Sequence, residues 1–228
     1  MEEFARELMS KLDTKDAFSI PIFGTKIPIP ESVVVTWGIM ALLMILTLIF
    51  VRNLKLIPTG PQRYIEALIG FLNNFFKGIL GEHGKKYFPF LGTLAIYIAF
   101  ANLSGLVGVT SPTKDLRVTA GLAILSICVI EYSAIHEKGV KGWLKGFAHP
   151  MPILLPINVL ELFIRPLSLC MRLFGNVLGA FIVMEMLKLV AEPILPVPFS
   201  IYFDIFDGLI QTYVFVFLTS LFMKEKME

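Results

Sequence analysis

The sequence predicts an all-α integral membrane protein with about five transmembrane helices, a surface amphipathic helix and one long tilted helix that carries a key arginine. Three observations predict this fold class. Hydrophobic residues make up 56% of the 228 residues and charged residues only 17%, whereas a soluble domain carries roughly 25% charge. The apolar residues are grouped in runs of about twenty, the length of a helix that crosses the hydrocarbon core. One apolar region, residues 151–195, is far too long for a single crossing.

Composition also excludes several other classes of protein. The net charge is only +2 and the basic residues are scattered, so no nucleic-acid partner is expected. Cys128 and Cys170 lie inside apolar runs and are interpreted as small core residues rather than as a disulfide or a metal pair. The sequence has neither phosphate-loop nor metal-ligand spacing, so we expect no cofactor, no metal, and no enzyme activity from this chain by itself.

The predicted membrane domain covers residues 32–223 and contains all five apolar regions. Residues 1–31 mix acidic and basic side chains and are predicted to be an extracytoplasmic segment, whereas residues 224–228 are predicted to be a cytoplasmic tail. The spans are predicted at residues 32–52, 87–109, 118–136, 151–195 and 199–223.

Residues 61–82 differ from the spans because polar side chains interrupt their apolar pattern. The apolar residues recur at helical spacing, which predicts a helix with one apolar face. Such a helix lies on the membrane surface, or it is a poor span packed against other helices. The interrupting residues are Gln62, Glu66, Asn73 and Lys77.

The lysines and arginines predict the orientation. With the N-terminus outside, eleven of them fall in cytoplasmic loops and six outside, which the positive-inside rule favours. The C-terminus is then cytoplasmic, and the number of spans is odd. The inner set is Arg52, Lys55, Arg63, Lys77, Lys85, Lys86, Lys138, Lys141, Lys145, Lys224 and Lys226, and the outer set is Arg6, Lys11, Lys15, Lys26, Lys114 and Arg117.

Residues 151–195 need a separate interpretation. As one helix they would extend about 65 Å, roughly twice the hydrocarbon thickness, so the helix must be strongly tilted, curved or broken. Pro156 and Pro166 are candidate bends. A steep tilt would lay a long side of this helix along another body within the bilayer.

Two arginines in this region lie inside an apolar helix. At 100° per residue, Arg172 shares one narrow polar stripe with Arg165 and their polar neighbours. Glu161 and Arg165 are spaced as an i,i+4 pair, so they either pair near the inner interface or border an ion path. Arg172 has no acidic residue within one turn, so we predict a functional role for it. The stripe consists of Glu161, Arg165, Ser168, Arg172, Asn176 and Gly179.

A second polar stripe marks the last span. Asp204, Asp207 and Gln211 share one of its faces, and Glu185 on the long helix is predicted at a similar depth toward the outside. These three carboxyl groups either line a water-filled entrance or serve local roles. In the local interpretation, Glu185 pairs with Lys188 and the aspartates cap a helix start.

Several motifs together resemble a known family. The segment Ser168–Asn176, which reads SLCMRLFGN, is similar to the signature of subunit a of F-type ATP synthases. Four further stretches agree in the family's order, and the resemblance covers about residues 32–223. These stretches are Pro58–Glu66, Asn102–Leu106 with Ser111–Thr119, Pro156–Glu161 with Arg165–Ser168, and Gln211–Phe215.

The resemblance implies a stator ion-channel subunit with two half-channels, which couples H⁺ or Na⁺ flow to rotation of a c-ring and to ATP synthesis. Arg172 would face the ring carboxylate and block a direct leak, and Asn176 and Gln211 would hold or hydrate that site. Glu185, Asp204 and Asp207 would line the outer half-channel, whereas Glu161, Arg165 and Ser168 would border the inner one. The implied partners are c-ring subunits, peripheral-stalk b subunits, the remaining ATP synthase subunits and membrane lipid, in a bacterial inner membrane.

One position departs from the family pattern. Many members carry a glutamate nine residues after the arginine, where this chain has Phe181, and its own acid, Glu185, follows one turn later. The lining of the outer half-channel is therefore expected to differ. The sequence assigns no role to Glu131, an acid in the third span.

Two other classes remain as alternatives. A stand-alone ion-coupled transporter would need its own paired ion site and internal repeats, and no repeat is visible in the sequence. A structural membrane anchor would tolerate a neutral residue in place of Arg172.

Overall fold

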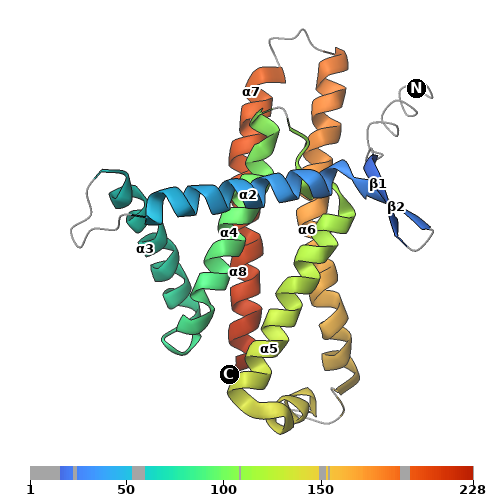
Figure 1. Cartoon of the computed structure of the whole chain (residues 1–228). Coiled ribbons are helices and arrows are strands. Elements are labelled where there is room, and N and C mark those ends of the chain that lie inside the picture. Colours follow the sequence, from blue (N-terminus) through green and yellow to red (C-terminus); the bar gives the residue numbers. More distant parts are fainter. Residues whose placement is uncertain are drawn as a thin grey trace. The chain divides into compact units, whose positions relative to one another are not determined.

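The computed structural model describes residues 16–22, 25–52, 60–107, 109–148, 153, 155–190 and 196–227. The predicted all-α membrane class is confirmed, because five helices in this part of the chain are long and apolar enough to cross a membrane. These are Glu31–Val51, Gly84–Leu106, Leu116–Phe147, Leu155–Leu187 and Ile205–Met227. The α-helices, labelled in Figure 1, are α2 (Glu31–Val51), α3 (Pro61–Leu80), α4 (Phe88–Leu103), α5 (Leu116–Ala148), α6 (Leu155–Val190), α7 (Pro196–Ile201) and α8 (Gly208–Met227).

Four shorter helical elements complete the described fold. Three are 3₁₀ turns at His83–Tyr87, Ser104–Val107 and Pro112–Lys114. The fourth is a π-helix, Tyr202–Asp207, which runs directly into α8. A π turn is rare and widens a helix by one residue, and it frequently occurs at functional sites.

A β-hairpin precedes α2, which the sequence analysis did not predict (Figure 1). Strand β1 (Asp16–Ile22) pairs antiparallel with β2 (Thr25–Pro30), so that Ile20 lies opposite Ile27 and Phe18 opposite Ile29. Apolar and small residues alternate along β1, the period of a strand. Three prolines also lie in this hairpin, which fits a two-stranded sheet, because every strand in it is an edge strand.

The chain divides into two compact units, and the long helices contribute residues to both. The Arg172 unit comprises Met1–Met44, Tyr97–Thr119 and Arg172–Thr212, and the Arg165 unit comprises Ile45–Ile96, Ala120–Met171 and Tyr213–Glu228. The two units are described one at a time below.

In the Arg172 unit, hydrogen bonds to Asp115 and Tyr97 hold the start of α2 in place. Ser32 Oγ donates to Asp115 Oδ2 at 2.5 Å, and Tyr97 OH donates to Thr36 Oγ1 at 3.2 Å. Asp115 also accepts a bond from the backbone N–H of Arg117 at 2.9 Å, at the start of α5. Both Ser32 and Asp115 are buried, so each satisfies the other's hydrogen-bonding demand away from water.

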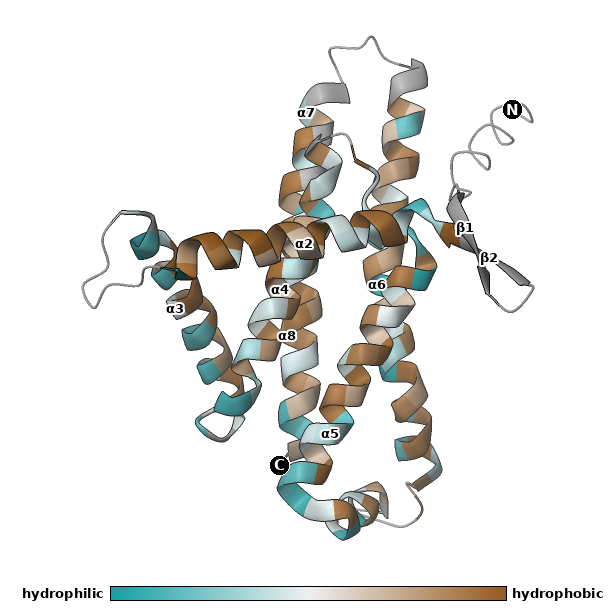
Figure 2. Cartoon of the chain, in the orientation of Figure 1, coloured by the Kyte–Doolittle hydropathy of each residue, from teal (hydrophilic) through white to brown (hydrophobic). Residues whose placement is uncertain are grey.

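In the Arg165 unit, α3 has the two faces that the sequence predicted. Phe76 and Leu80 are buried, and Phe75 contacts Tyr213 with ring centroids 5.4 Å apart. The polar residues of α3 lie along another face, coloured teal in Figure 2. In the last turn of α3, Lys77 Nζ lies 2.5 Å from Oε1 of Glu82, a residue that follows the helix. This hydrogen bond lowers the pKa of the exposed Glu82 carboxyl.

Helix α5 extends further than the predicted span, which ended at residue 136. It continues to Ala148 after a break at Gly139, whose φ of 71° and ψ of 164° are not helical. Glycine adopts this backbone conformation without the steric cost that a Cβ atom imposes. The helix therefore changes direction here rather than ending.

The long region is a single helix. Helix α6 has 36 residues with Pro166 inside it, and at 1.5 Å per residue it is about 54 Å long. Its bounds, Leu155–Val190, lie inside the predicted 151–195. Both arginines of the polar stripe therefore lie on one continuous helix.

Candidate functional site

Arg172 lies near the middle of α6, next to buried apolar side chains. Leu169 and Leu173 are buried, whereas Ser168 and Met171 are exposed. The half-buried Arg172 makes no hydrogen bond and no ion pair with any residue that the structure describes. Because a guanidinium stays protonated, Arg172 presents a fixed positive charge that is not neutralised within the described chain.

One turn further along α6, Asn176 is bonded to α8. Its Nδ2 donates to Gln211 Oε1 at 2.5 Å. Gln211 is only 2% exposed, and its own Nε2 is buried with no hydrogen-bond partner in the described structure. A buried amide donor without a partner is costly, so this N–H is available to a water molecule or to another group that enters the site.

A cavity of about 360 Å³ opens beside this pair within the Arg172 unit. Its size and polar groups allow it to hold several water molecules. The walls combine apolar side chains of α6 with polar groups from three other segments. Its lining residues are Asn102, Gly105, Val109, Thr110, Ser111, Lys114, Val177, Ala180, Phe181, Met184, Phe203, Asp207, Gly208 and Gln211.

Asn102 fixes the turn of α8 that forms one wall of this cavity. Its Nδ2 donates to Gly208 O at 2.9 Å and to Thr212 Oγ1 at 3.3 Å, and its Oδ1 accepts from Thr113 Oγ1 at 2.9 Å. A Cβ atom on Gly208 would lie 3.1 Å from Asn102 Cβ, a tighter contact than is usual, so the close approach of α4 and α8 favours glycine. The network thereby positions Asp207 and Gln211 on either side of Gly208.

In the sequence, Asn102 stands out only as part of a family motif, with no role of its own. Asn102 is an amide within the apolar run of α4, and this position could have predicted its structural role, because a buried amide must find hydrogen-bond partners.

Lys114 and Phe181 contact each other in the same cavity. Lys114 Nζ lies 3.4 Å from the centroid of the Phe181 ring, a cation–π contact. Phe181 therefore provides a ring face for a lysine at the position where many relatives carry a carboxylate.

The three carboxylates predicted for this region are placed differently from one another. Asp207 lines the cavity and is half-buried. Glu185 is half-buried but is not among the described residues that line the cavity. The side chain of Asp204 lies outside the described part of the structure.

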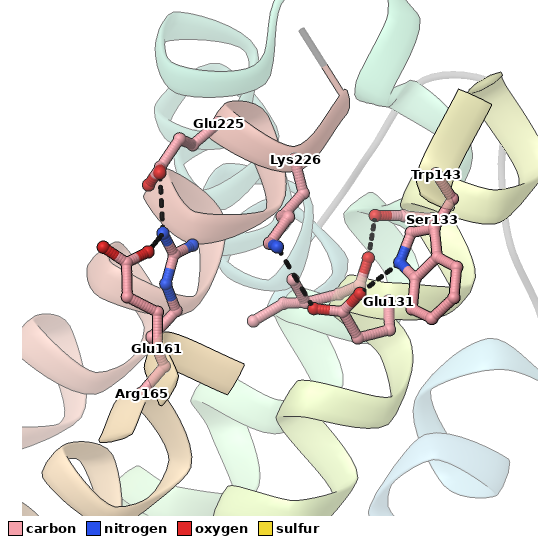
Figure 3. A network of polar contacts seen from close by, with 8 residues as sticks. Glu131, Ser133, Trp143, Glu161, Arg165, Glu225 and Lys226 are labelled. Carbon is pink, nitrogen blue, oxygen red and sulfur yellow. Dashed lines mark hydrogen bonds and ion pairs between the residues drawn. The ribbon is translucent and has the colours of Figure 1, made fainter. Parts of the chain in front are cut away.

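In the Arg165 unit, Arg165 has two carboxylate partners (Figure 3). It is 8% exposed, and its Nη2 lies 2.6 Å from Glu161 Oε2 and 2.6 Å from Glu225 Oε1. Its guanidinium also lies 4.9 Å from the ring centroid of Phe222. The i,i+4 pair with Glu161 is therefore present, and Glu225 is a partner that the sequence analysis assigned to a tail.

Figure 3 also shows the environment of Glu131, for which the sequence gave no role. Trp143 Nε1 donates to Glu131 Oε2 at 2.5 Å, and Lys226 Nζ lies 3.8 Å from Glu131 Oε1. This acid therefore ties the segment after the Gly139 break and the last turn of α8 to the body of α5.

A second, smaller cavity of about 170 Å³ lies at these ion pairs within the Arg165 unit. Glu161 and Arg165 line it, whereas Ser168, which was predicted to border the same path, is exposed and is not among its described lining residues. The lining residues are Lys138, Trp143, Gly146, Asn158, Glu161, Arg165, Glu225 and Lys226.

Five membrane-length helices, the longest of which carries an arginine without a partner among the described residues, define a multi-pass membrane protein. The family model described as ATP synthase A chain matches residues 33–224. The chain therefore belongs to the family of ATP synthase subunit a, and the resemblance found in the arginine motif is confirmed. Members of this family are non-catalytic subunits of the ATP synthase complex.

Several bacterial relatives are similar over most of their length. ATP synthase subunit a of Moorella thermoacetica is 38% identical over 85% of this chain and 88% of its own. ATP synthase subunit a 2 of a Bradyrhizobium species is 33% identical, over 86% and 88% of the two chains. The sodium-ion-specific ATP synthase subunit a of Propionigenium modestum is 30% identical, over 86% and 74%.

Proposed function

We propose that this chain is the stator ion-channel subunit of the membrane sector of an F-type ATP synthase, where it couples the flow of H⁺ or Na⁺ to rotation of a c-ring. Membership of the subunit a family supports this role. The observation that carries it is Arg172, a fixed cation with no carboxylate partner in the described chain. Its counter-charge is then supplied by another subunit, the carboxylate of a c subunit.

The electrostatics of such an encounter favour an ionised carboxylate opposite Arg172. Two unit charges about 4 Å apart attract by about 4 kcal/mol at an effective dielectric constant of 20. That energy corresponds to a pKa about three units lower for the ring carboxylate. A loaded site arriving at Arg172 therefore releases its ion, and an empty site is held ionised until it moves on.

We assign the larger cavity to the outer half-channel, in which Asn176 and Gln211 hold or hydrate the interface and Asp207 lines the wall. Glu185 and Asp204 are assigned to the same path, as the family resemblance implies. Glu161, Arg165 and Ser168 are assigned to the border of the inner half-channel. The cavity's orphan Gln211 amide and its Asp207 carboxyl support this assignment, since both can bond water.

The proposed setting is a bacterial inner membrane, with the N-terminus outside and the C-terminus in the cytoplasm. Residues 32–223 then form the membrane domain, and α3 lies at the membrane surface. The c-ring packs against the stripe of α6, and peripheral-stalk b subunits hold the chain as part of the stator. The bias of basic residues toward one set of loops and the bacterial relatives support this setting.

The test is ATP-driven ion pumping by inverted membrane vesicles that contain the assembled complex, with wild-type chain or Arg172→Ala. We expect pumping to vanish while the complex stays intact, because the ring carboxylate loses its counter-charge. The matched control is Arg117→Ala, which removes an exposed arginine outside the stripe. Unchanged pumping by Arg172→Ala would favour a membrane anchor or a differently organised transporter.

A further inference from the structure

The last part of α5, from the residue before the Gly139 break onward, carries a concentration of positive charge. Residues 138–148, the basic segment, contain Lys138, Lys141 and Lys145 and no acidic residue. All three lysines are exposed, and none forms an ion pair with a carboxylate in the described chain. The acids that precede the segment on α5 are engaged elsewhere, because Glu137 pairs with Lys86 and Glu131 with Lys226.

One face of the basic segment is fixed to the rest of the Arg165 unit. Trp143 donates its indole N–H to Glu131, and its ring meets Phe147 edge-on with centroids 4.9 Å apart. Phe147 is buried, Lys226 Nζ lies 4.6 Å from its ring centroid, and its carbonyl accepts from Asn158 Nδ2 at 2.8 Å. These bonds hold the segment in one orientation.

The faces of the basic segment that do not pack through Trp143 and Phe147 present apolar and basic side chains next to each other. Val140 is 59% exposed and Leu144 is 58% exposed, and at 100° per residue they lie side by side on the helix. Lys141 and Lys145 follow on the adjoining face, also one turn apart. In Figure 2 this bend carries teal and brown residues beside each other. An apolar face flanked by lysines is the pattern of a helix at a membrane interface.

The length of α5 places the segment at that interface. Residues 116–138, before the break, give a helix about 35 Å long, which already crosses the hydrocarbon core. The turn at Gly139 then takes the chain out of the crossing direction. Val140 and Leu144 can enter the acyl boundary while the lysines stay at the level of the headgroups.

We propose that the basic segment is a binding site for the headgroups of anionic phospholipids, with Lys138, Lys141 and Lys145 as the contacting cations. Charge complementarity selects this occupant, because three lysines without a carboxylate partner in the described chain, together with an exposed apolar pair, fit an anionic headgroup above an acyl chain. The site depends on the membrane class of the protein and not on the ion-channel role proposed above.

The test uses the complete ATP synthase complex in phosphatidylcholine vesicles that contain a minor fraction of photoreactive phosphatidylglycerol. After illumination, lipid adducts on residues 138–148 are quantified by mass spectrometry. A parallel sample contains photoreactive phosphatidylcholine in the same amount. We expect adducts on this segment to be about tenfold more abundant with phosphatidylglycerol, given three nearby lysines.

Two variants distinguish a loss of lipid binding caused by removing charge from one caused by misfolding. Replacing the three lysines by glutamine is expected to reduce the phosphatidylglycerol adducts about tenfold, while replacing them by arginine, which keeps the charges, preserves them. Assembly of each variant is checked by native electrophoresis. Equal labelling by the two lipids, or equal labelling of the glutamine and arginine variants, would overturn the proposal. Cross-links from this segment to another subunit without lipid adducts would instead identify a protein-binding surface.

Discussion

Helix α6 carries two arginines on one stripe, seven residues apart, and they differ in almost every contact. Arg165 is nearly buried and has two carboxylates at 2.6 Å, whereas Arg172 is half-buried and has none in the described chain. A guanidinium with two carboxylate partners has its charge neutralised locally. Arg165 therefore joins α6 to α8. A guanidinium without one retains its field for a group that arrives from elsewhere. The same residue type therefore does structural work at one position and remains available at the other.

The largest effect is expected from a variant that removes the difference between the two arginines by giving Arg172 a carboxylate partner on α6. Ser168→Glu places a carboxylate four residues before Arg172, the spacing of Glu161 and Arg165. We expect ATP-driven pumping in inverted vesicles to fall at least about tenfold below that of Ser168→Gln, because a local ion pair competes with the ring carboxylate. Equal pumping by the two variants would show that the unpaired state of Arg172 is unimportant.

The converse test compares the stability of two alanine variants. Arg165→Ala removes hydrogen bonds to two carboxylates and should lower the free energy of unfolding by about 2 kcal/mol. Arg172→Ala breaks no bond in the described chain and should change it by less than about 0.5 kcal/mol. The measurement is maleimide labelling of the buried Cys170 across a denaturant series, with the exposed Cys128 replaced by serine. A larger loss in Arg172→Ala than in Arg165→Ala would reverse our assignment of the two roles.

A smaller effect is expected where the cavity wall is set by close packing. Gly208→Ala introduces a Cβ atom 3.1 Å from Asn102 Cβ, which should cost about 1–2 kcal/mol. It should also reduce pumping several-fold, since Asp207 and Gln211 flank the displaced turn. Gly78→Ala in α3 is the matched control, because a Cβ atom there meets nothing within 4 Å. If both alanines behaved alike, the Asn102 contact would not position the wall.

The smallest effect on stability is expected at the exposed ion pair of Lys77 and Glu82, which serves as a reference for the ion pairs of the buried Arg165. Lys77 lowers the pKa of Glu82, so any stability that the pair contributes is present above the unfolded pKa of glutamate. It is lost as the pH falls through the lower folded value. Lys77→Met should return the Glu82 pKa toward its ordinary value in a ¹³C NMR titration, with a barely measurable change in stability. An unshifted pKa in the wild-type chain would contradict the contact.

The spans and the long helix could be predicted from sequence because apolar runs of membrane length leave few alternatives. The continuation of α5 past residue 136 could not, since a charged stretch with Gly139 is also typical of a loop. The β-hairpin before α2 was missed for a related reason. Short alternating strands give a weak signal, and the predicted extracytoplasmic segment carried no assigned secondary structure.

Arg172 was identified because it had no acidic residue nearby in sequence, and that argument needs no tertiary structure. Glu225 was missed because it lies sixty residues from Arg165, and no local spacing links the two. Trp143 and Glu131 are joined across the Gly139 break, where helical periodicity no longer predicts which residues meet. Family knowledge gave the motif around Asn102 but not its bonds to Gly208 and Thr113.

The sixty residues between Arg165 and Glu225 also have a consequence for how the chain is made. At about 5–20 residues per second, the ribosome delivers Glu225 roughly 3–12 s after Arg165. During that interval Arg165 has only Glu161 of its two carboxylate partners, so α6 enters the bilayer with one of the two ion pairs that Arg165 finally makes. The ion pair between Arg165 and Glu225 can form only after α8 has been synthesised. During those seconds the insertion machinery or a chaperone can bind the incomplete Arg165 unit.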